Sequence, residues 1–120
     1  MAEKKSPDLK FRTKQFALRV MKLVDALPSR RSCDVVGKQL RRSGTSVGAN
    51  YRAACRARST AEFCAKMGIV EEEADESAYW MELLVEGGVI EEARLKDLLA
   101  ETDEILAMVV ASIKTARSKR

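Results

Sequence analysis

The chain has 120 residues, of which 46% are hydrophobic and 33% charged, a balance typical of a single folded domain spanning residues 1–120. No run approaches the roughly 18 apolar residues of a membrane span, and three cysteines with no histidine argue against a zinc site or a disulfide framework. The net charge of +4 conceals two opposite halves, because residues 1–58 carry 15 Lys/Arg against 4 Asp/Glu whereas residues 59–113 carry 3 against 14.

The first helix is predicted over residues 7–27. Ser6 provides a cap, and proline in the first turn and Asp8 near the positive end of the helix dipole favour a start here. Pro28 ends the helix, because the residue before a proline disfavours helical torsions. Its apolar stripe consists of Phe16, Val20, Leu23 and Leu27.

The second helix is predicted over residues 33–57, with Ser32 as its cap. Its inner seam alternates steps of four and three and reads Val36, Leu40, Ser43, Val47, Asn50 and Ala54. Gly44 and Gly48 lie beside this seam, although a glycine inside a helix costs about 1 kcal/mol relative to alanine. We therefore expect another backbone to approach closely there, within the bundle or between subunits. Asn50, if buried, can fix the register of the packing.

Two further helices are predicted over residues 60–86 and 90–117. Ser59 and Glu62 form a capping box, and Gly87 and Gly88 end the third helix. Val89 to Glu92 begin the fourth helix. No segment has the pattern of a strand. Four helices joined by short links predict an all-α, antiparallel up-down-up-down four-helix bundle.

The basic residues of the second helix are the first candidate site. Arginine forks bind phosphate oxygens in pairs, and the stripe spans about 27 Å at 1.5 Å per residue. The candidate nucleic-acid contacts are Lys38, Arg42, Arg52 and Arg56, with Arg30, Arg31 and Arg58 nearby. The alternative is that these cations pair with a neighbouring subunit or with acids of the third helix, which are Glu71, Glu72, Glu73, Asp75 and Glu76. Arg41 is interpreted as structural, whereas Arg52 and Arg56 are expected to face outward.

Interface or packing roles are expected elsewhere. Tyr79 and Trp80 are adjacent, so they point about 100° apart on a helix and cannot both face one core. An interface is the favoured interpretation of this pair, with base stacking as the alternative. The acidic run is interpreted as a solvated or arginine-paired face, because di-metal bundles use a Glu-x-x-His unit. With neither an activated nucleophile nor a phosphate loop, we expect no enzymatic activity, metal or cofactor.

Two motifs resemble those of a known bacterial family. The first runs from Gln39 to Ala54, followed by Arg58-Ser59 and Ala61-Glu62-Phe63, and the second runs from Glu73 to Leu84. The chain resembles, over nearly its whole length, the four-helix-bundle proteins encoded in intervening sequences of large-subunit ribosomal RNA genes. The motif positions include Arg41, Arg42, Gly44, Gly48, Asn50, Arg52, Asp75, Glu76, Tyr79 and Trp80, and the motif assigns none of them a catalytic role.

The resemblance implies a left-handed antiparallel bundle that assembles into a homopentameric ring. A related branch is the accessory variability protein of diversity-generating retroelements, a basic pentameric barrel that works with a reverse transcriptase and its RNA template. The excess of acids in residues 59–113 departs from that basic character.

Together, these features predict a cytoplasmic, non-enzymatic homo-oligomer that binds RNA or DNA through a basic surface, with no membrane contact. A reverse transcriptase is the expected protein partner where the gene lies in a retroelement. The alternative is a structural assembly module whose basic and acidic helices pair within the oligomer, without binding nucleic acid.

Overall fold

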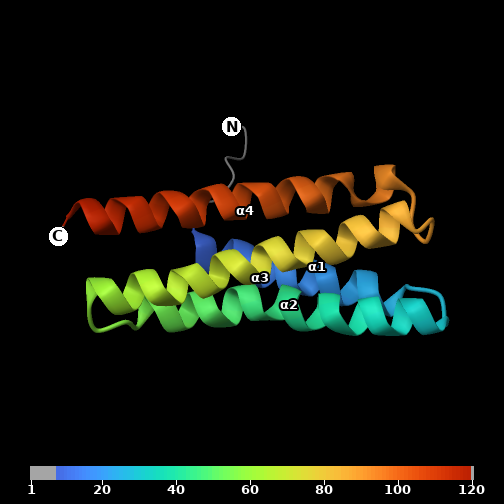
Figure 1. Cartoon of the computed structure of the whole chain (residues 1–120), viewed down its shortest axis with the longest axis horizontal. Coiled ribbons are helices and arrows are strands. Elements are labelled where there is room, and N and C mark those ends of the chain that lie inside the picture. The colour runs from blue at the N-terminus through green and yellow to red at the C-terminus, as the bar shows by residue number, and fades with distance from the viewer. Residues whose placement is uncertain (1–7, 120) are drawn as a thin grey trace.

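The structure is a computed structural model that describes residues 8–119 (Figure 1). Four helices make up the fold, and no strand occurs in this part of the chain. They are α1 (Leu9–Asp25), α2 (Arg31–Cys55), α3 (Thr60–Glu86) and α4 (Glu92–Ser118). Successive helices run in alternating directions along the long axis of the molecule (Figure 1). The all-α, four-helix prediction is confirmed.

The helices pack in a closed cyclic order. Helix α2 lies beside α1 and α3, and α4 lies beside α3 and α1, whereas the Cα atoms of the diagonal pairs α1–α3 and α2–α4 stay more than 8 Å apart. The core lies at the centre of this square arrangement. Its fully buried side chains include Phe16, Val20, Leu40, Val47, Met67, Val70, Met81, Ile105 and Val109. The predicted apolar stripes therefore face one another.

The helix caps explain where two of the elements begin. Asp8 caps α1, because its side chain accepts a hydrogen bond from the backbone N–H of Lys10 at 2.9 Å. The predicted cap Ser6 lies outside the described residues. Ser59 Oγ accepts from the backbone N–H of Glu62 at 3.0 Å, which confirms the serine half of the predicted capping box.

The prediction that Ser32 caps the second helix is wrong. Helix α2 begins at Arg31, so Ser32 lies inside it, and Arg30 at the cap position makes no side-chain cap bond. The connection between α1 and α2 is a short turn, in which the backbone N–H of Arg30 donates to the Pro28 carbonyl at 3.0 Å. The helix therefore resumes earlier than the capping pattern indicates. Asp34 in the first turn favours this start through the helix dipole.

The link between α3 and α4 confirms the role predicted for the glycine pair. Gly87 is the C-cap of α3, and Gly88 has φ +75°, a left-handed conformation that favours glycine. The backbone N–H of Val89 then bonds back to the Leu84 carbonyl at 2.9 Å. This turn reverses the chain and places α4 beside α3.

Candidate nucleic-acid interface

Helix α2 carries an exposed basic face on the side opposite the core. Its buried residues include Leu40, Gly44 and Val47, which occupy the inner side. The helical repeat directs the basic positions away from them. The α2 basic face consists of Arg31, Lys38, Arg41, Arg52 and Arg56, all exposed and none in an ion pair with another described residue. Arg30 and Arg58 are exposed at the two ends of the helix.

Arg42 has a different environment from the rest of the stripe. Its guanidinium forms ion pairs with Glu76 and with Glu73 of α3, the latter at 3.2 Å between Nη1 and Oε1. Trp80 Nε1 donates a second hydrogen bond to Glu76 at 3.0 Å. The Arg42 and Trp80 hydrogen bonds lower the pKa of Glu76. Arg42 therefore pairs with acids of the third helix, which was the alternative to nucleic-acid contact in the sequence analysis.

Arg41, interpreted from the sequence as structural, forms no ion pair with another described residue. Its side chain is exposed and lines a shallow groove with Met21, Lys38 and Thr45 between α1 and α2. The position follows Leu40 by one residue, which rotates it about 100° away from the core. Arg41 thus joins the exposed cations, while Arg42 contacts α3.

Gly44 and Gly48 lie where α1 crosses α2. A Cβ on Gly44 would lie 2.7 Å from Val20 Cγ1, and one on Gly48 would lie 3.2 Å from Thr13 Oγ1. A Cβ at Gly44 would therefore require Val20 to shift, whereas one at Gly48 would require Thr13 to give by a few tenths of an ångström. The close approach predicted from the spacing of the glycines occurs within the bundle.

Asn50 and Ser43 were both predicted on the inner seam. Ser43 is buried, and its Oγ accepts a hydrogen bond from Ser77 Oγ of α3 at 2.9 Å. Asn50 is only half-buried and donates to the Ser46 carbonyl of its own helix at 2.8 Å. Asn50 therefore lies at the margin of the predicted seam, and its side-chain hydrogen bond stays within α2.

Tyr79 and Trp80 lie on the outer part of α3. Tyr79 is 52% exposed, whereas Trp80 is half-buried and packs against the edge of the core. Their rings meet edge to face with centroids 5.1 Å apart. Asp75 is exposed nearby, and Glu76 is held by Arg42 and Trp80. The predicted position of Tyr79 and Trp80 outside the core holds for Tyr79 and in part for Trp80.

A buried ion-pair cluster links α1 to α4, and the sequence analysis missed it. Arg12 Nε and Nη2 donate to the two carboxylate oxygens of Glu101 at 3.0 and 2.7 Å, and Nη2 also donates to Glu104 at 2.7 Å. These hydrogen bonds raise the pKa of Arg12, so it stays charged. The signal was present, because Arg12 lies four residues before Phe16 on the apolar stripe.

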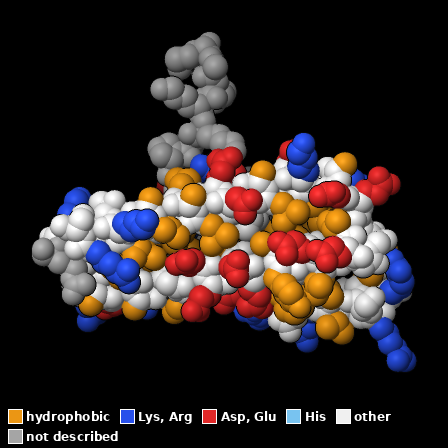
Figure 2. Space-filling model, turned by 45° about the horizontal axis from the view of Figure 1, so that its top comes forward, with side chains coloured by type: hydrophobic (Ala, Val, Ile, Leu, Met, Phe, Trp, Pro, Cys, Tyr) orange, Lys and Arg blue, Asp and Glu red, His pale blue; other side chains and the backbone are white. Residues whose placement is uncertain are grey.

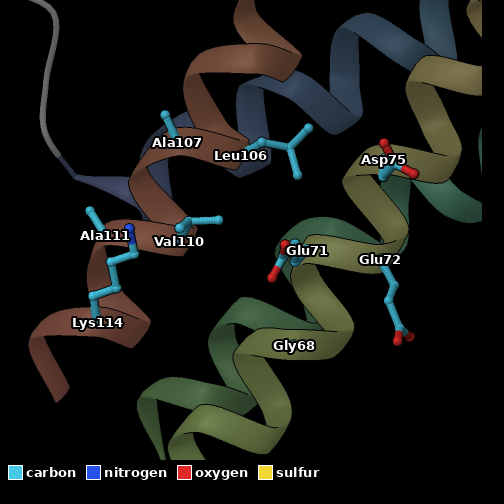
Figure 3. A pocket seen from close by; sticks show the side chains of 9 residues that line it. All are labelled: Gly68, Glu71, Glu72, Asp75, Leu106, Ala107, Val110, Ala111 and Lys114. Carbon is cyan, nitrogen blue, oxygen red and sulfur yellow. The ribbon is translucent and has the colours of Figure 1, made fainter. Parts of the chain in front are cut away.

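A shallow groove runs between α3 and α4, as Figure 3 shows. Glu71 turns toward α4, whereas Glu72 points away from it (Figure 3). Leu106 and Val110 of α4 form the apolar side of the groove. Figure 2 shows acidic side chains gathered over this side of the molecule, with apolar patches between them. The basic and acidic halves of the sequence thus form different surfaces.

The remaining reactive groups are dispersed. Cys33 is buried, Cys55 is exposed and Cys64 is half-buried. Burial and a hydrogen bond with Cys55 raise the pKa of Tyr51 to about 12. Within residues 8–119, no group of three or more Cys, Asp or Glu side chains could hold a metal ion. In the same range, no helix is long and apolar enough to cross a membrane.

Comparison with known proteins gives two positive findings. The profile described as "23S rRNA-intervening sequence protein" matches residues 8–111. A crystal structure of a protein of unknown function from the S23 ribosomal protein family of Bacteroides thetaiotaomicron has 36% sequence identity and a TM-score of 0.84. The match covers 89% of this chain and 99% of that one. The search of curated proteins found no match to the chain.

Proposed function

The chain belongs to the 23S rRNA-intervening sequence protein family, and we propose that it binds RNA or DNA through the α2 basic face. In this proposal it is a non-enzymatic, cytoplasmic homo-oligomer, a ring of five subunits. A reverse transcriptase is its protein partner where the gene lies in a retroelement, and the protein does not act on membranes.

The observation that carries the proposal is the lack of partners along the α2 basic face. Only Arg42 of the original stripe reaches acids of α3, while Lys38, Arg52 and Arg56 have no ion pair with another described residue. These three cations spread over about 27 Å of helix. That length matches several successive phosphates of a nucleic-acid strand, and each phosphate contact releases counterions.

The acidic residues of α3 and α4 support binding of the nucleic acid on one side of the molecule only. Helices α3 and α4 carry the excess of Asp and Glu, including exposed Glu72, Asp75 and Asp103. A phosphate backbone would be repelled from that side and attracted to the opposite one. The Arg42 pairs with Glu73 and Glu76 hold α2 and α3 together at the boundary between the two surfaces.

The test is an electrophoretic mobility titration against a structured RNA and a DNA duplex, at ~50 and ~200 mM salt. Binding of the wild-type protein must weaken steeply over that range. The double variant Arg52→Glu/Arg56→Glu is expected to lose about tenfold or more in affinity at the lower salt and to show a shallower salt slope.

A matched control places the same charge change on the acidic side. Arg94 and Lys96 are exposed on α4, so Arg94→Glu/Lys96→Glu should leave binding within about threefold of wild type. The proposal fails if the wild-type oligomer does not bind at ~50 mM salt, or if both double variants weaken binding equally. Dissociation of the oligomer by Arg52→Glu/Arg56→Glu, measured by light scattering, would favour the assembly-module alternative instead.

A further inference from the structure

The outer face of α1 carries an apolar stripe that the described part of the bundle leaves largely exposed. Phe11 is 56% exposed, Leu18 51% and Met21 42%. With Lys14 and Asp25 they occupy positions 11, 14, 18, 21 and 25, which alternate steps of three and four and so share one helix face. Lys14 and Lys22 make this α1 outer face basic as well as apolar.

The outer face of α3 shows the same spacing with the opposite charge. Ile69 is 42% exposed, Tyr79 52% and Leu83 36%. With Glu72 and Glu76 they occupy positions 69, 72, 76, 79 and 83. Glu72 points away from the α3–α4 groove (Figure 3). The α3 outer face is therefore apolar and acidic.

Exposed apolar side chains are concentrated on these two faces. Among residues 8–119, seven large hydrophobic side chains are exposed, and six of them belong to the two stripes. The seventh, Val35, lies on α2. Scattered exposed hydrophobic residues need no explanation, but aligned stripes indicate an interaction surface.

The two faces cannot meet within one chain. Helices α1 and α3 are diagonal in the bundle, and their Cα atoms stay more than 8 Å apart. Each turns its inner side to the shared core, so their outer faces point away from the molecule in opposite directions. Any contact between the two stripes must therefore join different copies of the chain.

We propose that the α1 outer face of one copy packs against the α3 outer face of a second copy. The matching three-four spacing permits side chains of one helix to fit between those of the other. The lysines of α1 would lie against Glu72 of α3, whereas Glu76 keeps its ion pair with Arg42. The α1 stripe extends about 15 Å from Phe11 to Met21, and the α3 stripe about 21 Å from Ile69 to Leu83.

This contact is head-to-tail, because the two partners use different surfaces. An open row of copies therefore keeps one free α1 face at one end and one free α3 face at the other until the contacts close into a ring. This contact specifies how the homo-oligomer of the proposed function is held together. It rests on the proposal that the protein is a homo-oligomer and not on the proposal that it binds nucleic acid. It leaves the α2 basic face available for nucleic acid.

The test measures mass in solution by light scattering, without nucleic acid. Leu18→Glu places a charge at the centre of the α1 stripe, and Tyr79→Glu does so on the α3 stripe. Burying an unpaired carboxylate is costly, so each variant alone should fall from an oligomer to the 13.4 kDa monomer. Val35→Glu adds the same charge to α2 and should leave the wild-type mass unchanged.

Mixing the two variants gives the decisive result. The Tyr79→Glu chain keeps an intact α1 face and the Leu18→Glu chain keeps an intact α3 face, so the mixture should form a heterodimer and nothing larger. Circular dichroism checks that each variant is folded, and Phe11→Glu and Leu83→Glu serve as second variants on the two faces.

Three outcomes would overturn the inference. They are a monomeric wild-type protein, variants that keep the wild-type mass, and a mixture that stays monomeric. If the wild-type protein is an oligomer and the variants leave it intact, the homo-oligomer stands and only this contact is wrong. Loss of nucleic-acid binding alone does not bear on the contact.

Discussion

The contact between α1 and α2 and the contact between α3 and α4 are built differently, as the glycines in each show. At Gly44 in α2 an added Cβ would lie within 3.0 Å of three atoms of Val20. At Gly68, on the α3 side of the groove, it would meet nothing within 4 Å. The same residue type thus marks close packing in one place and open surface in the other.

The difference teaches that α1 is held by specific fits on both of its sides. It meets α2 through the glycine contact and α4 through the cluster of Arg12, Glu101 and Glu104. Helices α3 and α4 instead leave a shallow acidic groove along part of their contact. Substitutions at the α1 contacts should therefore be costly, and those at the groove should be tolerated.

The largest effect is expected from Arg12→Ala. The substitution removes the guanidinium from the buried carboxylate of Glu101, and breaking a buried pair in this way costs about 3–5 kcal/mol. Denaturant unfolding should show this loss in the free energy of unfolding. Arg19→Ala, on the exposed side of the same helix, is the control and should change stability by no more than about 0.5 kcal/mol. If both variants lower the free energy of unfolding by the same amount, the Arg12 cluster does not stabilise the protein more than an exposed arginine of α1 does.

Gly44→Ala should lower the free energy of unfolding by about 1–2 kcal/mol. Overpacking costs about 1–3 kcal/mol, and the higher helix propensity of alanine offsets up to ~1 kcal/mol of that. Val20 is branched at Cβ and so has few rotamers with which to yield. The shift appears in the midpoint of chemical denaturation.

The matched substitution in the other region is Gly68→Ala. Its site in α3 is open, so only the gain in helix propensity remains, and stability should rise by about 0.5–1 kcal/mol. Opposite signs for the two glycines are the expected result. If Gly44→Ala also stabilises the protein, the close packing of α1 on α2 is not as tight as described.

The smallest effect concerns pH and the partly exposed Glu76. Its pKa is lowered in the folded state by Arg42 and Trp80, so its contribution to stability is present above the unfolded pKa and is lost as the pH falls through the lower folded pKa. Glu76→Gln should thus reduce stability at pH 7 by less than about 1 kcal/mol, with a smaller reduction at pH 3. A pH-independent difference in melting temperature between variant and wild type would contradict this assignment.

The fold could be predicted largely from the sequence, because local rules decide most of it. The apolar stripes, the Ser59 cap and the Gly87-Gly88 break each act within a few residues. The prediction that Ser32 caps α2 was wrong, because the helix already begins at Arg31 and Ser32 lies inside it. A serine therefore marks a helix start only where the chain before it is not already helical. Asn50 shows that a side chain at a seam position can be only half-buried and bond to its own helix.

The candidate site was less predictable, because its environment depends on contacts between helices. The helical periodicity placed Arg42 on the basic stripe, but it could not show that the Arg42 side chain is close enough to α3 to pair with Glu76. Arg41 was interpreted as structural, and the helical repeat turns it outward, so a structural role would need a contact outside the bundle. The apolar stripe could have indicated that Arg12 is buried, but its partner Glu101 lies 89 positions away and no local pattern identifies it.

The cyclic order of the helices has a consequence for how the chain folds. Three of the four helix contacts join helices that follow each other in the sequence, and only the contact between α1 and α4 brings the two ends of the chain together. Local contacts form with little loss of loop entropy, and helical proteins rich in them fold quickly. The joining of α1 to α4 through Arg12 closes the longest loop of the bundle, so it is the step for which chain entropy sets the highest barrier.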